Sequence, residues 1–366
     1  MAQGNIPDPI RTLFDNIQND LQGSKAYHSF RKGSKEVTEF YLTDEQRKRL
    51  QGMHRIKQAL FLFGWILRAM MQKLTPARQI MFIIGIVLLI SVRASFGESN
   101  TISLDFNALF GGGLLVLVIL LELKDKLLAH DELEAGRNIQ ESLMPERMPN
   151  VNGWNLWLYT RSANEVCGDL IDFLRMDSGQ FSIAMADVAG KGLHAALITA
   201  KLQATIRALA GEIRSLPELI GRINTIVHRD SPSHIFSSLF YAECSEKNGT
   251  VRFVNAGHFP ALIIRGTTIE ESPKGDAALG LAGSMTFSER EIILNSGDRF
   301  VLYSDGLTEA KNESGEFFGK ERMMMILASA TGTPEHIGLS IIREVERFSG
   351  SSSPSDDLSI IILQRS

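Results

Sequence analysis

Residues 167–192 read CGDLIDFLRMDSGQFSIAMADVAGKG and contain two apolar runs, 170–176 and 181–187, separated by the turn-forming sequence DSG. This pattern predicts a β-hairpin with an acidic cluster at the end of each strand. Two further acidic sequences, YSDG at 303–306 and SDD at 355–357, also adjoin apolar runs that are typical of strands. Carboxylates gathered without matching Lys or Arg need divalent cations to be tolerated, so the sequence predicts a metal site.

The apolar runs beyond this hairpin predict a larger domain with many strands. Strands are expected at 154–160, 238–244, 251–255, 261–265, 288–294, 299–304 and 358–364, and helices at 193–210, 217–230, 320–330 and 334–348. Antiparallel strands with inserted helices are typical of the α+β class.

The composition narrows the class of protein further. The chain has 366 residues, of which 44% are apolar and 22% are charged, and this is ordinary for a folded protein of one large or two modest domains. A net charge of −4 predicts no general attraction to nucleic acid. The two cysteines, Cys167 and Cys244, argue against a disulfide framework and favour a reducing compartment. Cys167 is followed by GDLIDF instead of an arginine-bearing phosphate loop, so we expect a small buried residue and not a catalytic thiol.

The first third of the chain is organised differently. Residues 79–92 (QIMFIIGIVLLISV) and 107–121 (NALFGGGLLVLVILL) are dense apolar stretches separated by a short polar loop, which predicts a transmembrane helical hairpin. Each stretch is slightly shorter than the roughly 20 residues that span a bilayer, so flanking residues must contribute or the bilayer must thin. A pair of buried helices is the alternative.

Basic residues set the expected orientation of this hairpin. They flank its outer ends at Arg68, Lys73, Arg78, Lys124 and Lys126, whereas the loop is poor in them. The positive-inside rule therefore predicts a multi-pass protein of the inner membrane with both ends, and the large domain, in the cytoplasm. No cleavable signal peptide is expected, because the N-terminus lacks an early apolar core.

The segments on either side of the hairpin allow several interpretations. Residues 1–75 contain a basic stretch, 47–55, and an apolar stretch, 59–71, which fit an interfacial helix, a third membrane element or a small cytoplasmic bundle. Residues 125–148 carry one apolar stripe on a charged background and predict a linker helix. This helix either pairs two chains as a coiled coil or lies on the following domain, 149–366. The hairpin itself occupies 76–124.

Five motifs in a fixed order identify a family. They are EVCGDLIDF at 165–173, DVAGKGLHAA at 187–196, FVNAGHFP at 253–260, GDRFVLYSDGLTEA at 297–310 and SDDLS at 355–359. Together they resemble the bacterial metal-dependent serine phosphatases of the PPM (PP2C-like) superfamily, in the SpoIIE/RsbU-like branch of the stressosome and sporulation phosphatases. The resemblance covers about residues 138–366. It implies a sandwich of two antiparallel sheets flanked by helices, with a two-metal site at one end.

The resemblance also implies roles for individual residues. Asp187 would bridge both metals, Asp169 would bind one of them, and both are the implied catalytic positions. Asp305 and Asp356 would complete the other metal, with the carbonyl of Val188 as a further ligand. Oxygen-only ligands suit two Mn²⁺ or Mg²⁺ ions better than zinc. Such a pair lowers the pKa of a metal-bound water for direct attack on the phosphoryl group, without a phosphoenzyme.

Other polar residues near the motifs have structural alternatives. Arg161 is a candidate for binding the substrate phosphate, although most single arginines are solvated. His258 could act as an acid or base, but a structural hydrogen bond suits its strand-turn-strand position better. Asp172 and Asp357 are expected to support the ligands or cap local structure.

The implied activity is hydrolysis of phosphoserine or phosphothreonine on a regulatory protein, such as an anti-sigma-factor antagonist. This sequence departs from the family pattern at Cys167, where glycine is usual, and at Ala189, where serine is common. Neither departure removes a ligand. The alternative is a catalytically silent membrane scaffold or dimerisation module, and the intact set of four aspartates argues against it.

Overall fold

A computed structural model describes residues 55–90, 106–176, 179–232 and 234–366. The chain divides into two compact units, Met1–Lys126 and Leu127–Ser366.

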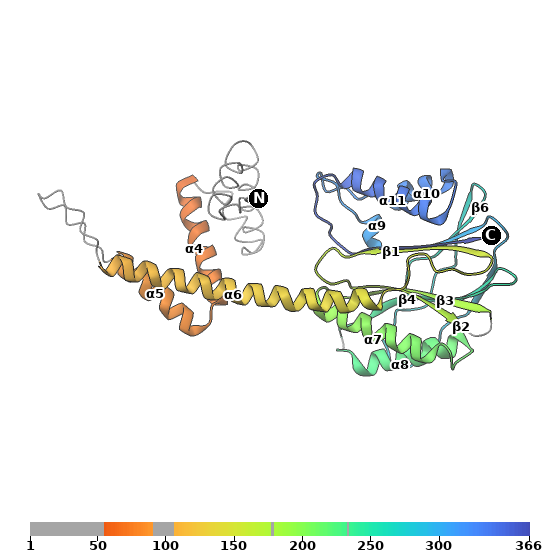
Figure 1. The fold of residues 1–366 in the computed structure, drawn as a ribbon, viewed down its shortest axis with the longest axis horizontal. Coiled ribbons are helices and arrows are strands. Elements are labelled where there is room, and N and C mark those ends of the chain that lie inside the picture. The colour runs from red at the N-terminus through yellow and green to blue at the C-terminus, as the bar shows by residue number, and fades with distance from the viewer. Residues whose placement is uncertain (1–54, 91–105, 177–178, 233) are drawn as a thin grey trace, which may run out of the picture. The chain divides into compact units, whose positions relative to one another are not determined.

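The second unit contains two five-stranded sheets (Figure 1). The first sheet has the strand order β1 (Trp154–Arg161), β10 (Leu358–Arg365), β9 (Arg299–Tyr303), β6 (Leu262–Arg265) and β7 (Thr268–Glu271). The second has the order β2 (Asp169–Met176), β3 (Gln180–Val188), β4 (Ser237–Ser245), β5 (Thr250–Ala256) and β8 (Arg290–Ile293). Neighbouring strands are antiparallel throughout. The predicted two-sheet antiparallel sandwich is confirmed.

Helices cover both outer faces of the sandwich (Figure 1). The first sheet carries α10 (Lys320–Ser329) and α11 (Pro334–Ser349), and the second carries α7 (Leu193–Leu209) and α8 (Leu216–Asp230). Apolar side chains fill the space between the sheets and the two spaces between sheet and helices. Central strands are therefore apolar on both faces, as in β9, where all five residues are buried.

The predicted strands and helices of this unit are present, with boundaries shifted by at most a few residues. Two elements were missed. β7 is a four-residue edge strand whose side chains are mostly exposed, so it carries no apolar alternation. α9 (Asp305–Thr308) is a single helical turn and is too short to show a helical period. In the turn predicted at 177–179, residues 177–178 lie outside the described part.

The described part of the first unit is helical. It contains α4 (Arg55–Lys73), α5 (Pro76–Ile90) and the start of α6 (Phe106–Leu143), which continues into the second unit. The predicted second span and the predicted linker are thus one continuous helix, because no proline interrupts residues 107–143. The basic stretch at 47–54 and the loop at 93–105 lie outside the described residues.

Among the described residues, α6 is the one helix that is long and apolar enough to cross a membrane. α5 has 15 residues, fewer than the roughly 20 that a straight span needs. Of the two predicted spans, only the one in α6 therefore meets the length for crossing a membrane among the described residues. The two helices nevertheless contact each other. A Cβ built on Gly111 would lie 2.8 Å from the carbonyl oxygen of Gly85, and Arg78 pairs with Glu122 at 2.6 Å and Asp125 at 2.7 Å.

Gly338→Ala tests how closely α11 packs on the first sheet. A Cβ at Gly338 would overlap the ring of Trp157, so the helix or the ring must shift. We expect the free energy of unfolding, measured by urea denaturation, to fall by about 1–3 kcal/mol. Gly221→Ala in α8 is the matched control, because nothing lies within 4 Å of a Cβ built there. The control should gain up to about 1 kcal/mol, and equal stability of the two variants would contradict the packing argument.

A candidate acidic metal site

The register of β2 and β3 brings the two predicted catalytic aspartates together. Asp169 is the first residue of β2 and lies directly opposite Asp187 of β3. Side chains of directly paired residues lie on the same face of an antiparallel sheet. Asp169 is buried and Asp187 is half-buried. The hairpin thus holds two carboxylates side by side at the end of the sandwich.

A hydrogen bond from the other sheet fixes Asp169. The hydroxyl of Ser359 on β10 donates to Asp169 Oδ2 at 2.6 Å, and Thr160 of β1 contacts the same hydroxyl at 2.8 Å. Burial raises the pKa of Asp169 well above its usual range, whereas the Ser359 hydrogen bond opposes this shift. The sequence predicted no role for Ser359. Its one signal was its place in the terminal SDDLS motif.

Ser304 completes this polar connection. Its hydroxyl donates to the carbonyl of Asp357 at 3.1 Å and accepts from the backbone N–H of Ser359 at 2.9 Å. Ser304 is the last residue before α9 and immediately precedes Asp305. It therefore joins the segment that carries Asp305 to the segment that carries Asp356 and Asp357, a link that sequence analysis also missed.

The remaining predicted ligands share the electrostatic environment of Asp187. Burial, followed by the charges of Asp305, Asp356 and Asp357, raises the pKa of Asp187 to about 6. Burial and then the charge of Asp356 also raise the pKa of Asp305. Lys191 acts in the opposite direction on both groups. These charge effects place the carboxylates of Asp305 and Asp356 near that of Asp187.

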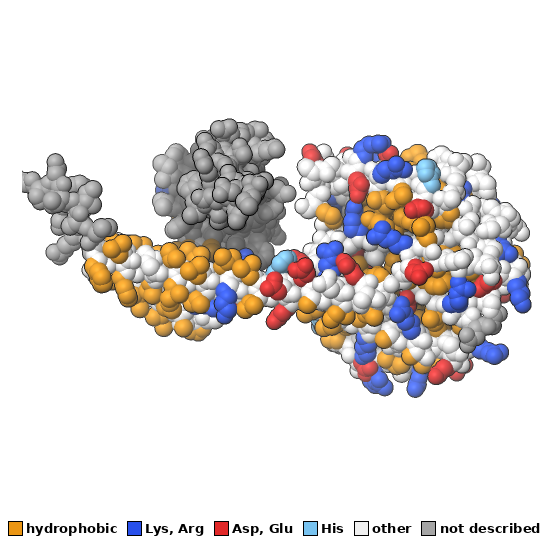
Figure 2. Space-filling view, in the orientation of Figure 1, with side chains coloured by type: hydrophobic (Ala, Val, Ile, Leu, Met, Phe, Trp, Pro, Cys, Tyr) orange, Lys and Arg blue, Asp and Glu red, His pale blue; other side chains and the backbone are white. Residues whose placement is uncertain are grey.

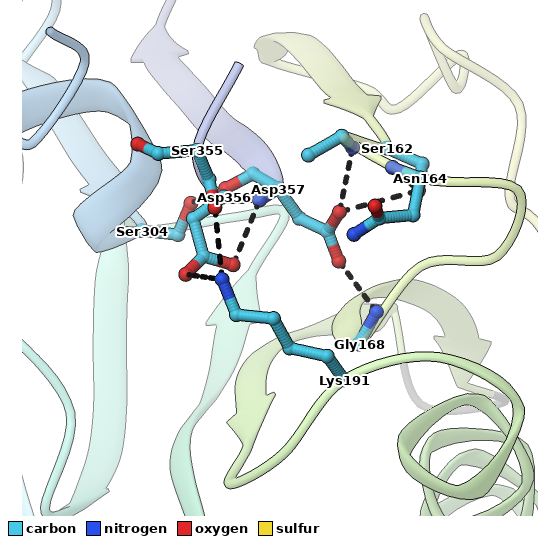
Figure 3. A network of polar contacts seen from close by, with 9 residues as sticks. Ser162, Asn164, Gly168, Lys191, Ser304, Ser355, Asp356 and Asp357 are labelled. Atoms are coloured by element: carbon cyan, nitrogen blue, oxygen red, sulfur yellow. Dashed lines mark hydrogen bonds and ion pairs between the residues drawn. The ribbon is translucent and has the colours of Figure 1, made fainter. Parts of the chain in front are cut away.

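Lys191 crosses this region (Figure 3). It extends from the loop after β3 and donates to Asp356 Oδ2 at 3.1 Å and to the carbonyl of Ser355 at 2.8 Å. Among the described residues, no three His, Cys, Asp or Glu side chains are close enough together to hold a metal ion. The oxygen donors suit Mg²⁺ or Mn²⁺ in type. They would have to draw together, with Asp356 leaving Lys191, before they could share a cation.

Asp357 faces away from Lys191 (Figure 3) and holds the loop that leads into β2. Its carboxylate accepts from the backbone N–H groups of Gly168 at 2.5 Å and Ala163 at 2.7 Å, and from the hydroxyl of Ser162 at 3.2 Å. These three bonds suit the supporting role that we predicted for Asp357. They position Gly168, and with it the start of the strand that carries Asp169.

Asp172 has a structural role at the end of α6. Its carboxylate pairs with Arg207 of α7 at 2.7 Å and accepts from Gln203 at 3.1 Å. Gln203 and Arg207 both also donate to the carbonyl of Leu143 at 3.0 Å. Asp172 thereby orients the two side chains that bind the last carbonyl of this helix.

A second contact joins α6 to the site. Gln140 donates to the carbonyl of Cys167 at 2.7 Å and accepts from its N–H at 2.9 Å. Cys167 lies two residues before Asp169 and is buried, and burial raises the pKa of its thiol. The expectation of a small buried residue is confirmed.

His258 supports Asp187 through Ser238. The Ser238 hydroxyl accepts from the backbone N–H of Asp187 at 3.1 Å and lies 2.9 Å from His258 Nδ1. Burial lowers the pKa of His258 to about 4, so its imidazole is neutral near pH 7. The structural hydrogen bond that we expected is present.

Arg161 does not reach Asp187. Its guanidinium pairs with Glu346 of α11 at 2.6 Å, and it lines a pocket of about 250 Å³ together with Asp356. Phosphate binding by Arg161 stays a prediction. The carbonyl of Val188, also predicted as a ligand, lies 3.8 Å from a Cβ built on Gly168 and so faces the start of β2.

The two-sheet sandwich has the fold of PP2C-type phosphatase domains. The family model described as Stage II sporulation protein E (SpoIIE) matches residues 177–366, and the chain belongs to this family. It is 25% identical to Protein IcfG of Synechocystis sp. (strain ATCC 27184 / PCC 6803 / Kazusa) over 64% of this chain and 41% of that protein. It is 26% identical to phosphoserine phosphatase RsbU of Bacillus subtilis (strain 168) over 50% of this chain and 55% of that protein.

The chain therefore spans about half the length of these curated relatives, 41% of one and 55% of the other. Among solved structures, the SiaA-PP2C domain of Pseudomonas aeruginosa superimposes with a TM-score of 0.57 at 19% identity. The match covers 66% of this chain and 99% of that domain. At this level of identity the match supports the fold alone.

The raised pKa of Asp187 predicts how stability depends on pH without metal. The folded protein holds this proton up to about pH 6, whereas the ordinary value is 3.8. The stabilising contribution is therefore complete below about pH 4 and is lost as the pH rises through 6. In chelator at pH 7, we expect Asp187→Asn to raise the free energy of unfolding by up to about 3 kcal/mol.

Urea denaturation in chelator between pH 4 and about 8 measures this effect. The wild-type protein should lose stability as the pH rises, and Asp187→Asn should reduce that loss. Glu212→Gln, an exposed change at the far end of α7, serves as the control and should follow the wild type. An Asp187→Asn variant with wild-type pH dependence would refute the electrostatic argument.

Proposed function

We propose that this chain is a metal-dependent phosphatase acting on phosphoserine or phosphothreonine in a regulatory protein. The strongest support is that burial and the charges of Asp305 and Asp356 raise the pKa of Asp187, and that burial and the charge of Asp356 raise the pKa of Asp305, with Lys191 opposing both shifts. Carboxylates concentrated in this way are stabilised by divalent cations. Membership in the SpoIIE family and similarity to a relative named phosphoserine phosphatase support the same activity.

Two Mn²⁺ or Mg²⁺ ions are the proposed cofactors. Asp169, Asp187, Asp305, Asp356 and the Val188 carbonyl would hold them through oxygen atoms alone. Bound there, the ions would supply Lewis acidity that activates water and offsets charge on the phosphoryl oxygens.

The chain's own residues would orient these ligands. Ser359 keeps Asp169 Oδ2 in place. His258 and Ser238 fix the backbone of Asp187 from the opposite side. Hydrogen bonds that lock the supporting groups hold such a site in its productive geometry.

The proposed substrate is an anti-sigma-factor antagonist carrying a phosphorylated serine or threonine. This proposal rests on the motifs, which resemble the stressosome and sporulation branch. The net charge of −4 gives no support to a nucleic-acid partner. A catalytically silent scaffold would be free to lose metal ligands, and this chain retains all four aspartates.

Loss of the aspartates should abolish turnover. We expect the full chain in detergent to hydrolyse a phosphoserine peptide with Mn²⁺ or Mg²⁺ but not with chelator. Asp187→Asn and Asp305→Asn should each lower kcat/KM by at least about 100-fold, because a metal contributes several kcal/mol to the transition state. Glu212→Gln should keep wild-type activity. A folded wild-type protein that binds metal without turnover would favour the scaffold instead.

The first unit is proposed to anchor the protein in the inner membrane as a multi-pass hairpin, with the catalytic domain in the cytoplasm. Apolar side chains dominate the visible surface of α5 and the first half of α6 (Figure 2). Only 11% of the most apolar stretch of α6 is buried, whereas a core helix of a soluble protein would be mostly buried. The close approach of Gly85 and Gly111 suits helix packing in a bilayer. Flanking basic residues support the orientation.

The charged half of α6 is also proposed to pair two chains. Leu128 and Ile139 of the predicted apolar stripe are 50% and 64% exposed and would lie on the seam of a coiled coil.

Membrane fractionation tests the proposed membrane anchor, and cross-linking tests the proposed pairing through α6. We expect the full chain to stay in the pellet after carbonate washing and residues 127–366 to stay in the supernatant, because only the full chain contains the apolar helices. Cross-linking of the same pellet should trap dimers. Release of the full chain by carbonate would exclude a spanning hairpin, and exclusively monomeric protein would exclude pairing through α6.

A further inference from the structure

We propose that a groove beside the aspartates binds the peptide segment next to the phosphorylated residue and selects an apolar side chain there. This inference rests on the proposed phosphatase function. The groove, called here the Phe236–Phe259 groove, has a volume of about 550 Å³. Its lining includes Phe236, Phe259, Lys274 and Ala278 together with Asp187 and Asp305.

The groove lies next to the site where the phosphorylated residue of a substrate would bind. Asp187 and Asp305, two of the predicted metal ligands, form part of its wall. A phosphoseryl group that reaches these carboxylates would place neighbouring peptide residues within reach of the groove. The volume lies in the range of small-ligand pockets, which suits a short extended segment better than the surface of a folded domain.

The chemistry of the groove favours an apolar side chain. Phe236 and Phe259 are 43% and 41% exposed, and the remaining wall includes Pro260, Ala278 and Ala189. Exposed aromatic rings in a concave site are typical of binding pockets. The groove therefore offers apolar contacts directly beside a strongly acidic centre.

Lys274 provides charge complementarity to a phosphopeptide. It is exposed, and among the described residues its side chain makes no hydrogen bond or ion pair. It is the one Lys or Arg in the groove lining. An ammonium group at the rim would attract a phosphorylated segment over the length of the screening distance, about 10 Å at 0.1 M salt.

The groove is held in shape by the NAGHFP motif. The Asn255 side chain accepts from the backbone N–H of His258 at 2.8 Å and donates to its carbonyl at 3.1 Å. Gly257 has a positive φ of 73°, and a Cβ built on it would lie 2.7 Å from the backbone of Ala278, so only glycine permits this approach.

A stacking contact also holds the ring of Phe259 in place. Its ring stacks on the ring of Tyr303 with centroids 5.5 Å apart, and Tyr303 lies two residues before Asp305. A preorganised groove costs little ordering entropy when a peptide binds. The aromatic surface is thus fixed relative to the catalytic aspartates.

The test uses the full chain in detergent with Mn²⁺. Substrates are p-nitrophenyl phosphate and phosphoserine peptides on a glycine background, in which leucine is placed in turn at each of the two positions before and after the phosphoserine. Both turnover and fluorescence anisotropy of labelled peptides are measured. At one position, leucine should raise kcat/KM and lower Kd by about tenfold relative to glycine.

Phe236→Ala and Phe259→Ala should remove this leucine preference through KM, so that leucine and glycine peptides are hydrolysed with similar kcat/KM. Phe317→Ala removes a phenylalanine that is 51% exposed outside the groove and should change nothing. Lys274→Gln should weaken binding of leucine and glycine peptides alike and reduce the salt sensitivity of that binding.

The outcomes separate the two proposals. Turnover without leucine preference at any position, or a preference that survives in both phenylalanine variants, would overturn the groove. The wild-type protein could instead hydrolyse no substrate but bind leucine peptides selectively. If Phe236→Ala removes that selectivity, the result would support the groove and overturn the phosphatase function.

Discussion

Repulsion between two carboxylates is the constraint on which the site depends. Antiparallel pairing of β2 and β3 sets Asp169 opposite Asp187, and partial burial strengthens their interaction. The surrounding polar groups compensate for this arrangement. Ser359 donates to Asp169 from the other sheet, while Lys191 approaches Asp356. The two sheets are therefore tied together at the point where negative charge is concentrated. The raised pKa values of Asp169 and Asp187 come first from burial, and the charges of neighbouring carboxylates are a further cause.

Asp169 and Asp172 are both buried on β2, but their different partners suit different roles. Asp172 has the guanidinium of Arg207 at 2.7 Å and forms part of a network that ends at the Leu143 carbonyl. Asp169 has a hydroxyl partner and no guanidinium within the described contacts. The charge of Asp172 is thus neutralised within the protein, which suits a structural role. Asp169 lacks such a partner among the described residues and burial raises its pKa, so an added cation would stabilise its charged form. Burial of this kind carries a cost in stability that is common at functional sites.

Much of the fold and part of the site were predictable from the sequence. Strands with apolar runs and helices with a clear period were recognised, because those patterns are local. β7 and α9 were not, because an exposed edge strand and a single turn leave no periodic trace. The aspartates were recognised through motifs that combine them with turn glycines. Ser304 and Ser359 lay inside those motifs but no role was predicted for them. Serine is common at strand ends, and only its hydrogen-bond partner in the folded protein shows its role.

The sequence by itself determined the two-sheet class, the family and the four acidic positions, because each is encoded by residues close together in the chain. The tertiary structure decided which groups meet across long separations. It paired Arg161 with Glu346, placed Lys191 on Asp356, and set Phe236 beside Phe259 in one groove. Each of these contacts joins residues that are far apart in the chain and meet only in the folded domain. A local pattern specifies each loop's conformation but not its neighbours, which depend on how the two sheets close upon each other.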